Sequence, residues 1–209
     1  MSLFNLKKFV SYLAVTALLA GLSINSFAQE ASNSSQPAVT SVATTSPEPG
    51  WWEQAKAGTT NILENGELSI MLSGYARHGR NTYTAERIAE LNENAWGLGF
   101  SKAVRNKKDN EDSLFGLAIS DSHFKPQFMA GYAHQWMQPI GGNFEAGVGY
   151  TALLISRTDY FSGIPFPGVL PVASIGTRRS KLMASYIPRL SQNKGNGDVL
   201  LLFLRLDLN

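Results

Sequence analysis

The sequence predicts an all-β protein, an eight-stranded antiparallel transmembrane β-barrel preceded by a short amphipathic N-terminal helix. Apolar and polar residues alternate with a period of two in eight segments from residue 68 onward. A secretory signal occupies residues 1–28, and no long apolar run follows it. Together these features are typical of an outer-membrane barrel, whose sheet closes because lipid offers an open strand edge no hydrogen-bonding partner.

The N-terminal segment has the three regions of a secretory signal peptide. A pair of lysines precedes an apolar run over residues 9–22, and a small-x-small pattern ends at Ala28. We therefore expect residues 1–28 to be removed during export. Residues 29–49 are rich in Ser, Thr, Pro and Ala and have almost no large apolar side chains, so they predict a flexible linker.

Composition narrows the range of functions. The chain has 18 Lys and Arg against 16 Asp and Glu, and residues 1–28 carry two of the lysines and no acid, so 16 of each sign remain. This neutral balance indicates that nucleic acid is not a partner. The absence of cysteine excludes cysteine-based metal sites and nucleophiles, and no spacing of the histidines suggests a metal. No cofactor is expected, and the remaining 181 residues (209 minus 28) suit one domain.

Residues 50–64 predict a short amphipathic helix. The apolar side chains that can share one of its sides are Trp51, Trp52, Ala55 and Ile62. Two adjacent tryptophans suit a membrane interface, because each apolar ring carries a polar N–H. A helix docked on a soluble core fits this stretch equally well.

Residues 68–209 predict the barrel. Gly, Pro, Asn and Lys clusters separate eight candidate strands, which are residues 68–78, 95–104, 113–121, 127–138, 143–156, 168–177, 180–188 and 198–209. On the last strand, five leucines from Leu200 to Leu208 alternate with residues that include Phe203 and Arg205. A soluble lipocalin-type barrel has the same period but a more polar exterior, so the leucine face favours lipid.

The inward faces predict the character of the barrel interior. On the fourth strand Phe128, Tyr132 and Trp136 point outward, which leaves Met129 and Ala133 inside. Other inward positions are mostly small or apolar: Gly131, Gly147, Gly149, Met183, Ser185, Leu201 and Phe203. Such a lining either leaves a narrow apolar slot that suits an acyl chain or is filled by larger neighbours.

One polar cluster interrupts this pattern. In "LFGLAISDSHFKPQF", residues 114–128, an apolar run ends in Ser120, Asp121, Ser122 and His123. This is either an ordinary polar turn at a strand end or the rim of a catalytic site. His123 and His134 have the ordinary interpretations of a loop histidine and an outward interfacial histidine.

Three sequence pieces resemble one family when taken in order. They are "GYARHGR" with His78, "NAWGLGFS" with Trp96, and "AISDSHFKPQFMAGY" with Asp121 and Ser122. His78 and Trp96 are 18 residues apart, and Trp96 and Asp121 are 25 apart. Together with "GIPFPGVLPVASIG" and "SYIP", these pieces are similar to the PagP family of lipid A palmitoyltransferases over about residues 50–209.

The resemblance implies a concrete activity. Proteins of this family move a palmitoyl group from the sn-1 position of a glycerophospholipid to a hydroxyacyl chain of lipid A in the outer membrane. This remodels lipopolysaccharide and confers resistance to antimicrobial peptides. The resemblance also implies that His78, Asp121 and Ser122 are essential residues near the extracellular rim. It implies a role for Arg157 more weakly. A monomer or a homodimer is expected.

The sequence also departs from the family. Two family prolines are replaced by Ser73 and Ala95, so strands there can pair and a lateral opening for lipid is in doubt. Pro171 and Pro188 match the family's other pair and predict an opening on their side. A family glycine at the pocket floor is replaced by Ala133. The added methyl predicts a preference at or slightly below palmitoyl length, unless Met129 relaxes.

Acyl transfer needs a base for the attacking hydroxyl and stabilisation of the oxyanion. We expect His78 to be the base and Asp121 to orient it. Asp121 and Ser122 are adjacent and would point to opposite sides of a regular strand, so Ser122 is expected to support the reaction, with a nucleophilic role as the alternative. Two other functions remain: a non-catalytic lipid-binding or structural barrel, and an outer-membrane phospholipase that uses water as the acceptor.

Overall fold

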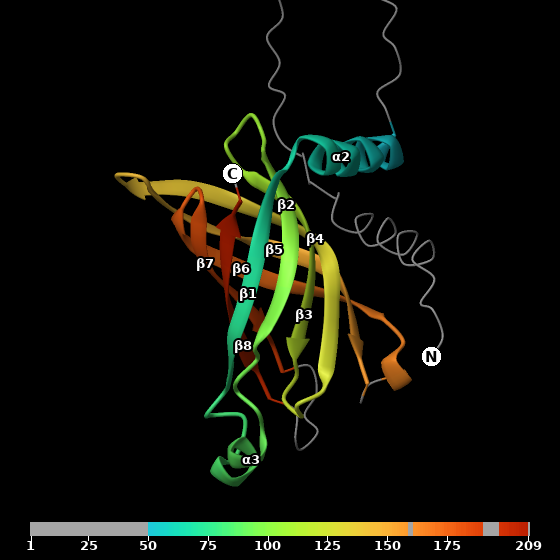
Figure 1. Cartoon of the computed structure of the whole chain (residues 1–209), viewed down its shortest axis with the longest axis vertical. Coiled ribbons are helices and arrows are strands. Elements are labelled where there is room, and N and C mark those ends of the chain that lie inside the picture. Colours follow the sequence, from blue (N-terminus) through green and yellow to red (C-terminus); the bar gives the residue numbers. More distant parts are fainter. Residues whose placement is uncertain (1–49, 159–160, 190–196, 209) are drawn as a thin grey trace, which may run out of the picture.

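The chain forms a closed eight-stranded barrel in a computed structural model that describes residues 50–158, 161–189 and 197–208. Each strand pairs antiparallel with the next, and β1 pairs with β8 to complete the cylinder (Figure 1). The expected fold class is therefore confirmed. The signal peptide over residues 1–28 and the linker over residues 29–49 lie outside the described residues and stay predictions.

The strand boundaries agree with the expected segments to within three residues, the largest difference being the end of β4. The strands are β1 (Glu67–His78), β2 (Gly97–Arg105), β3 (Glu111–Ser120), β4 (Pro126–Gly141), β5 (Phe144–Arg157), β6 (Phe166–Thr177), β7 (Ser180–Ile187) and β8 (Val199–Asp207). Residues inside these segments alternate between the two faces of the sheet, so the period of two in the sequence located them.

The inside and outside of the wall follow the predicted alternation. Phe128 and Trp136 are 54% and 49% exposed on the outer wall, while Met129 and Ala133 are each 5% exposed. On β8, Leu201 and Phe203 are buried between partly exposed leucines. An apolar outer surface is what a barrel in lipid requires.

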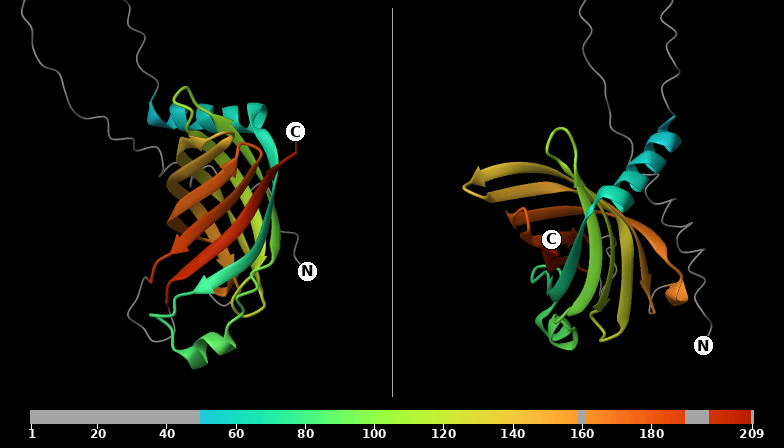
Figure 2. Two further views of the ribbon diagram at one scale, coloured as in Figure 1. Left: turned by 90° about the vertical axis from the view of Figure 1, so that its left-hand side faces the viewer. Right: turned by 45° about the horizontal axis from the view of Figure 1, so that its top comes forward.

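Helix α2 (Trp51–Asn65) lies across one end of the barrel (Figure 2). Ile62 is buried and Ala55 is half-buried, which confirms that these two share the packed side, whereas Trp52 is exposed and lies 5.5 Å from the Lys56 ammonium. Lys102 on β2 donates to the Leu63 carbonyl at 2.5 Å and ties the helix end to the wall. Within the described residues, no helix has the length and apolar character needed to cross a membrane.

The two ends of the barrel carry different connections. At the end opposite α2, the β1–β2 loop contains a helix that we did not expect, α3 (Ala85–Glu90), and η1 (Phe161–Gly163) lies between β5 and β6. Thr84 starts α3 because its hydroxyl accepts the Arg87 N–H at 3.3 Å. At the α2 end the strands are joined by turns of a few residues, such as the one between β4 and β5. Short turns at one end and long loops at the other are typical of outer-membrane barrels.

The interior near α2 holds a layer of buried charges, which corrects the expectation of a small and apolar lining along the whole lumen. Glu111 accepts two hydrogen bonds from Arg205, at 2.5 and 3.1 Å, and one from Lys181 at 2.7 Å. Lys181 is fully buried and also lies 2.6 Å from Glu145, which pairs in turn with Arg105. Burial of these charges is tolerated because each has an opposite charge within contact distance.

Candidate active site

His78 and Ser122 meet at the long-loop end of the barrel. His78 is the last residue of β1, and Ser122 lies in the turn that follows β3. The His78 Nε2 atom is 2.9 Å from Ser122 Oγ, and the imidazole is only 1% exposed. The Tyr83 ring packs edge-on against the imidazole at 5.3 Å between centroids. A hydroxyl in hydrogen-bond contact with a buried imidazole is the arrangement in which histidine removes a proton from an alcohol.

The described contacts of Asp121 lie in its own turn and at Arg157 and not at His78, so its expected role of orienting the imidazole stays a prediction. Its Oδ1 accepts the backbone N–H groups of His123 and Lys125, both at 2.8 Å. Its Oδ2 lies 3.6 Å from Arg157 Nη2. Asp121 therefore shapes the turn that presents Ser122, and it links this turn to the last residue of β5.

The turn itself explains how adjacent Asp121 and Ser122 serve different partners. The strand ends at Ser120, and the backbone N–H of Asp121 donates to the Lys125 carbonyl at 2.8 Å. Phe124 adopts a positive φ of 60° inside the turn. Because this backbone is irregular, the two adjacent side chains need not point to opposite sides, as they would in a regular strand. Ser122 points to His78, and Asp121 points to Arg157.

Glu93 and Arg80 complete the surroundings of His78, and we did not expect either of them. Glu93 Oε1 is 3.4 Å from His78 Nδ1 and accepts the His78 backbone N–H at 2.9 Å. Arg80 binds both oxygens of Glu93, at 2.8 and 2.9 Å. The Arg80 guanidinium is the main reason that the pKa of Glu93 is lowered to about 2. Arg80 falls inside the piece "GYARHGR", two residues after His78, whereas Glu93 lies one residue before the piece "NAWGLGFS" and had no signal in the motifs.

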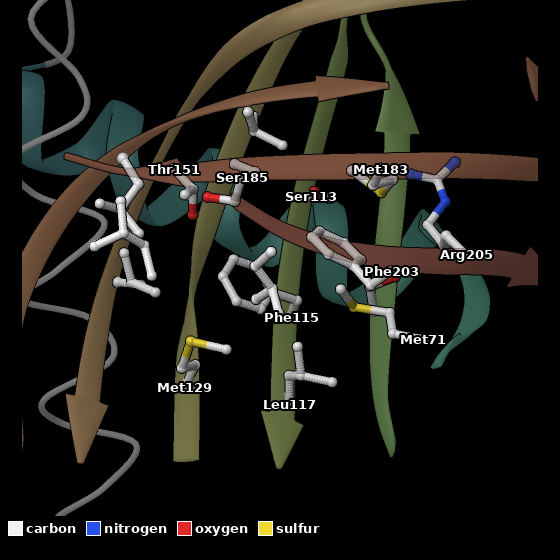
Figure 3. Close-up of a pocket in the computed structure, with 17 residues that line it drawn as sticks. Met71, Ser113, Phe115, Leu117, Met129, Thr151, Met183, Ser185, Phe203 and Arg205 are labelled. Carbon is white, nitrogen blue, oxygen red and sulfur yellow. The ribbon is translucent and has the colours of Figure 1, made fainter. Parts of the chain in front are cut away.

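An apolar cavity lies inside the barrel and extends to Arg205 of the charged layer (Figure 3). Met129 and Ala133 line it, as expected, together with Met71, Phe115, Leu117, Leu153, Leu170, Val172, Met183, Ile187, Leu201 and Phe203. The cavity has a volume of about 50 Å³. The structure therefore shows a narrow cavity inside a largely filled interior, and the acyl slot stays a prediction.

The end of the slot nearest to α2 is polar. Ala133 pairs with Ser113 across β4 and β3, and two residues further on Gln135 pairs with Glu111 of the charged layer. Arg205 belongs both to this layer and to the cavity lining (Figure 3). An apolar chain that reaches Ala133 therefore meets buried charges directly beyond it, where a methylene group has no favourable place.

The wall beside the cavity is incomplete between β6 and β7. Their pairing stops at Val172 and Ser185, although β6 continues back to Phe166. Pro171 is the first residue past the break, and its carbonyl accepts the Ser185 hydroxyl at 3.2 Å instead of a strand N–H. Pro188 directly follows the end of β7. The stretch without ladder hydrogen bonds therefore lies between β6 and β7, where Pro171 and Pro188 predicted an opening.

The β1–β2 ladder ends at Ser73, one of the two positions that lack a proline, and β1 continues beyond it to His78. In this continuation the N–H of Ala76 donates to the Glu93 carbonyl at 2.9 Å. The ladder runs from Glu67 opposite Ala103 to Ser73 opposite Gly97. Beyond it, the N–H of Ala95 donates to the Glu93 carbonyl at 3.0 Å. A proline at position 95 would have no N–H for this bond.

Comparisons with known proteins agree with this geometry. A family model described as "Antimicrobial peptide resistance and lipid A acylation protein PagP" matches residues 59–205. The chain is 39% identical over 157 residues to "Lipid A acyltransferase PagP" of Bordetella pertussis (strain CS), covering 75% of this chain and 85% of that protein. It is 43% identical over 134 residues to the protein of the same description in Legionella longbeachae serogroup 1 (strain NSW150), covering 63% and 58%. Among solved structures, Neisserial surface protein A (NspA) shows a weak likeness, with a TM-score of 0.35 and 13% identity over 68% of this chain and 95% of that one.

Proposed function

The chain belongs to the PagP family of lipid A acylation proteins, and on this premise we propose that it transfers a palmitoyl chain from the sn-1 position of a glycerophospholipid to a hydroxyacyl chain of lipid A. The reaction takes place in the outer membrane, at the long-loop end of the barrel. Long loops of such barrels face the outside of the cell, where the lipid A leaflet lies.

The observation that carries this proposal is the pairing of a buried His–Ser contact with an apolar slot in one interior. The slot is lined mainly by Met, Leu, Val and Phe side chains, which suit a saturated acyl chain. Leu117 lines the slot, and only four positions further along the chain Asp121 begins the turn that carries Ser122. A chain held in the slot therefore places its ester near the His78 imidazole.

The geometry favours Ser122 as the hydroxyl that His78 activates. His78 Nε2 takes the Ser122 proton while Oγ attacks the sn-1 carbonyl carbon, the bond from that carbon to the glycerol oxygen breaks, and the lysophospholipid leaves with the proton. A lipid A hydroxyl then gives its proton to His78, attacks the acyl-serine, and Ser122 leaves as a hydroxyl. Asp121 holds the turn, and Arg157 adds a positive charge next to it.

The phospholipid donor enters through the β6–β7 break. Pro171 and Pro188 flank a stretch of wall without ladder hydrogen bonds, and Leu170, Val172 and Ile187 line the cavity beside it. An acyl chain can pass sideways between strands only where no backbone hydrogen bonds need to be broken. On the β1–β2 side a backbone hydrogen bond from Ala76 to Glu93 persists beyond the end of the ladder, so we assign the donor to the proline side.

Mass spectrometry of lipid A from cells that express the protein tests the proposed function. The expected result is a lipid A species heavier by one acyl chain, which disappears when His78 is replaced by asparagine. Release of free fatty acid from phospholipids with unchanged lipid A would instead identify a phospholipase. Unchanged lipid A and unchanged phospholipids would identify a structural or lipid-binding barrel.

Changing the size of residue 133 is expected to change the preferred acyl-chain length. Ala133→Gly deepens the slot and favours longer donors, and Ala133→Met shortens it and favours much shorter ones. A mismatch of one methylene is worth about 1–3 kcal/mol of discrimination. The measurement is transfer from phosphatidylcholines whose sn-1 chains differ by one carbon.

A matched control uses Ala118, an exposed alanine on the outer face of neighbouring β3. Ala118→Met adds the same side chain outside the wall and is expected to leave the length optimum unchanged. If Ala133→Met also leaves it unchanged, residue 133 does not limit the depth of the slot.

A further inference from the structure

The second ring nitrogen of His78 decides which protons the imidazole can move. Nε2 faces the Ser122 hydroxyl at 2.9 Å, so it must be unprotonated to accept that proton. In a neutral imidazole the ring proton is then on Nδ1. Nδ1 is buried and makes no hydrogen bond, and Glu93 Oε1 lies 3.4 Å from it. No other acidic side chain among the described residues forms an ion pair with the His78 ring.

The Glu93 carboxylate is held rigidly and stays charged. Oε1 accepts the backbone N–H of His78 and one Arg80 nitrogen, and Oε2 accepts the other. The pKa of Glu93, about 2, keeps it anionic at any working pH, with Arg80 as the largest cause. Its backbone is fixed as well, because the Glu93 carbonyl accepts the N–H groups of Ala76 at 2.9 Å and Ala95 at 3.0 Å.

We propose that Glu93 is the positioning residue for His78, so that Ser122, His78 and Glu93 act together and Asp121 does not take the third place. Glu93 holds the Nδ1–H tautomer, which leaves the Nε2 lone pair free for the Ser122 proton. When His78 becomes an imidazolium during transfer, the same carboxylate stabilises the positive charge. The inference rests on the proposed transfer reaction and names the acidic partner of its base.

Asp121 is unsuited to this place for a geometric reason. One of its oxygens is occupied by two backbone N–H groups of its own turn, and the other faces Arg157. Glu93, by contrast, reaches His78 from the β1–β2 loop and contacts both the ring and the backbone of that residue. The two acids therefore have separate tasks: Asp121 shapes the serine turn, and Glu93 positions the histidine.

Imidazole ¹⁵N NMR of histidine-labelled protein in detergent micelles tests the proposal independently of activity. The chain has three histidines, so a His78→Asn sample assigns the His78 signals. At a pH at which the His78 imidazole is neutral, we expect the wild-type ring to carry its proton on Nδ1. Glu93→Ala is expected to shift His78 towards the Nε2–H tautomer, whereas Glu93→Gln keeps much of the Nδ1–H form because its amide oxygen can still accept.

Kinetics provide the second readout. Glu93→Ala is expected to lower kcat by on the order of 10²-fold with little change in KM, and Glu93→Gln to fall between this variant and the wild type. Glu90→Ala is the matched control, since Glu90 is an exposed acid of the same loop that pairs only with Arg87 among the described residues. It is expected to match the wild type in both readouts.

Three results would overturn the proposal. The first is a wild-type His78 that carries its proton on Nε2, which needs no variant to fold. The second is an unchanged tautomer in Glu93→Ala, even if activity falls, because the loss would then be structural. The third is a wild-type kcat in Glu93→Ala. If the wild type fails to acylate lipid A but shows the expected tautomers, the transferase proposal fails while the positioning by Glu93 stands.

Discussion

Replacement of His78 by asparagine is expected to lower the rate of acyl transfer by on the order of 10⁴-fold, with the barrel still folded. Asparagine cannot accept the Ser122 proton and return it to the leaving group. Asparagine is polar and fits the buried space at the end of β1, but its shorter side chain does not reach the position of Nε2 that contacts Ser122 Oγ. Little packing is therefore lost, and the effect falls on the chemistry.

The assay uses purified protein in detergent with phospholipid and lipid A, and heat-modifiable migration in gels reports the folded barrel. His123→Asn is the matched control, because His123 is an exposed imidazole of the same turn and contributes its backbone N–H to Asp121. It is expected to stay close to wild-type activity. Near-full activity of His78→Asn would remove His78 from the reaction.

Two further substitutions separate the roles around His78. Ser122→Ala abolishes transfer if the serine carries the acyl group, whereas a measurable residual rate indicates direct attack by the lipid A hydroxyl. Asp121→Ala is expected to reduce activity because two backbone N–H groups of the serine turn lose their acceptor.

The strands and the lumen face were predictable because strand alternation is a local property. Met129 and Ala133 follow from their distance of an odd number of residues from Phe128 and Trp136, and no tertiary information is needed for that. The helix α3 was missed because it has only six residues and no buried side chain, so its pattern is too short to recognise.

The acidic partner of His78 was not predictable in the same way. Asp121 is the acid next to Ser122 in the chain, but its turn engages its carboxylate with backbone groups. Glu93 comes close to His78 because of the path of the β1–β2 loop, which residue spacing does not determine. Arg80 then fixes it, in a contact that spans 13 positions of the sequence. The sequence pieces contained His78 and Arg80 but not Glu93.

The charged layer was missed for a related reason. Glu111 is 70 positions from Lys181 and 94 from Arg205, so their contact depends on the register of strands on opposite sides of the barrel. Glu111 also lies two residues before the expected third strand, 113–121, so the sequence analysis did not place it on a barrel face. Only the closed sheet brings β3, β7 and β8 to a common point.

Removal of Glu111 is expected to destabilise the barrel by about 3–5 kcal/mol. Glu111→Ala leaves the buried ammonium of Lys181 and guanidinium of Arg205 without their shared carboxylate. Glu145 and Asp207 still contact these cations but do not replace the bidentate pair. The loss is measured as the change in unfolding free energy in urea, with the barrel refolded in lipid vesicles.

A double-mutant cycle shows whether the cause is unpaired charge rather than lost volume. Glu111→Met with Lys181→Met removes one charge of each sign and is expected to be clearly more stable than Glu111→Met alone. Glu64→Ala, an exposed acid on α2, is the control and is expected within about 0.5 kcal/mol of the wild type. A double variant no more stable than the single one would show that the layer is held by packing and not by charge.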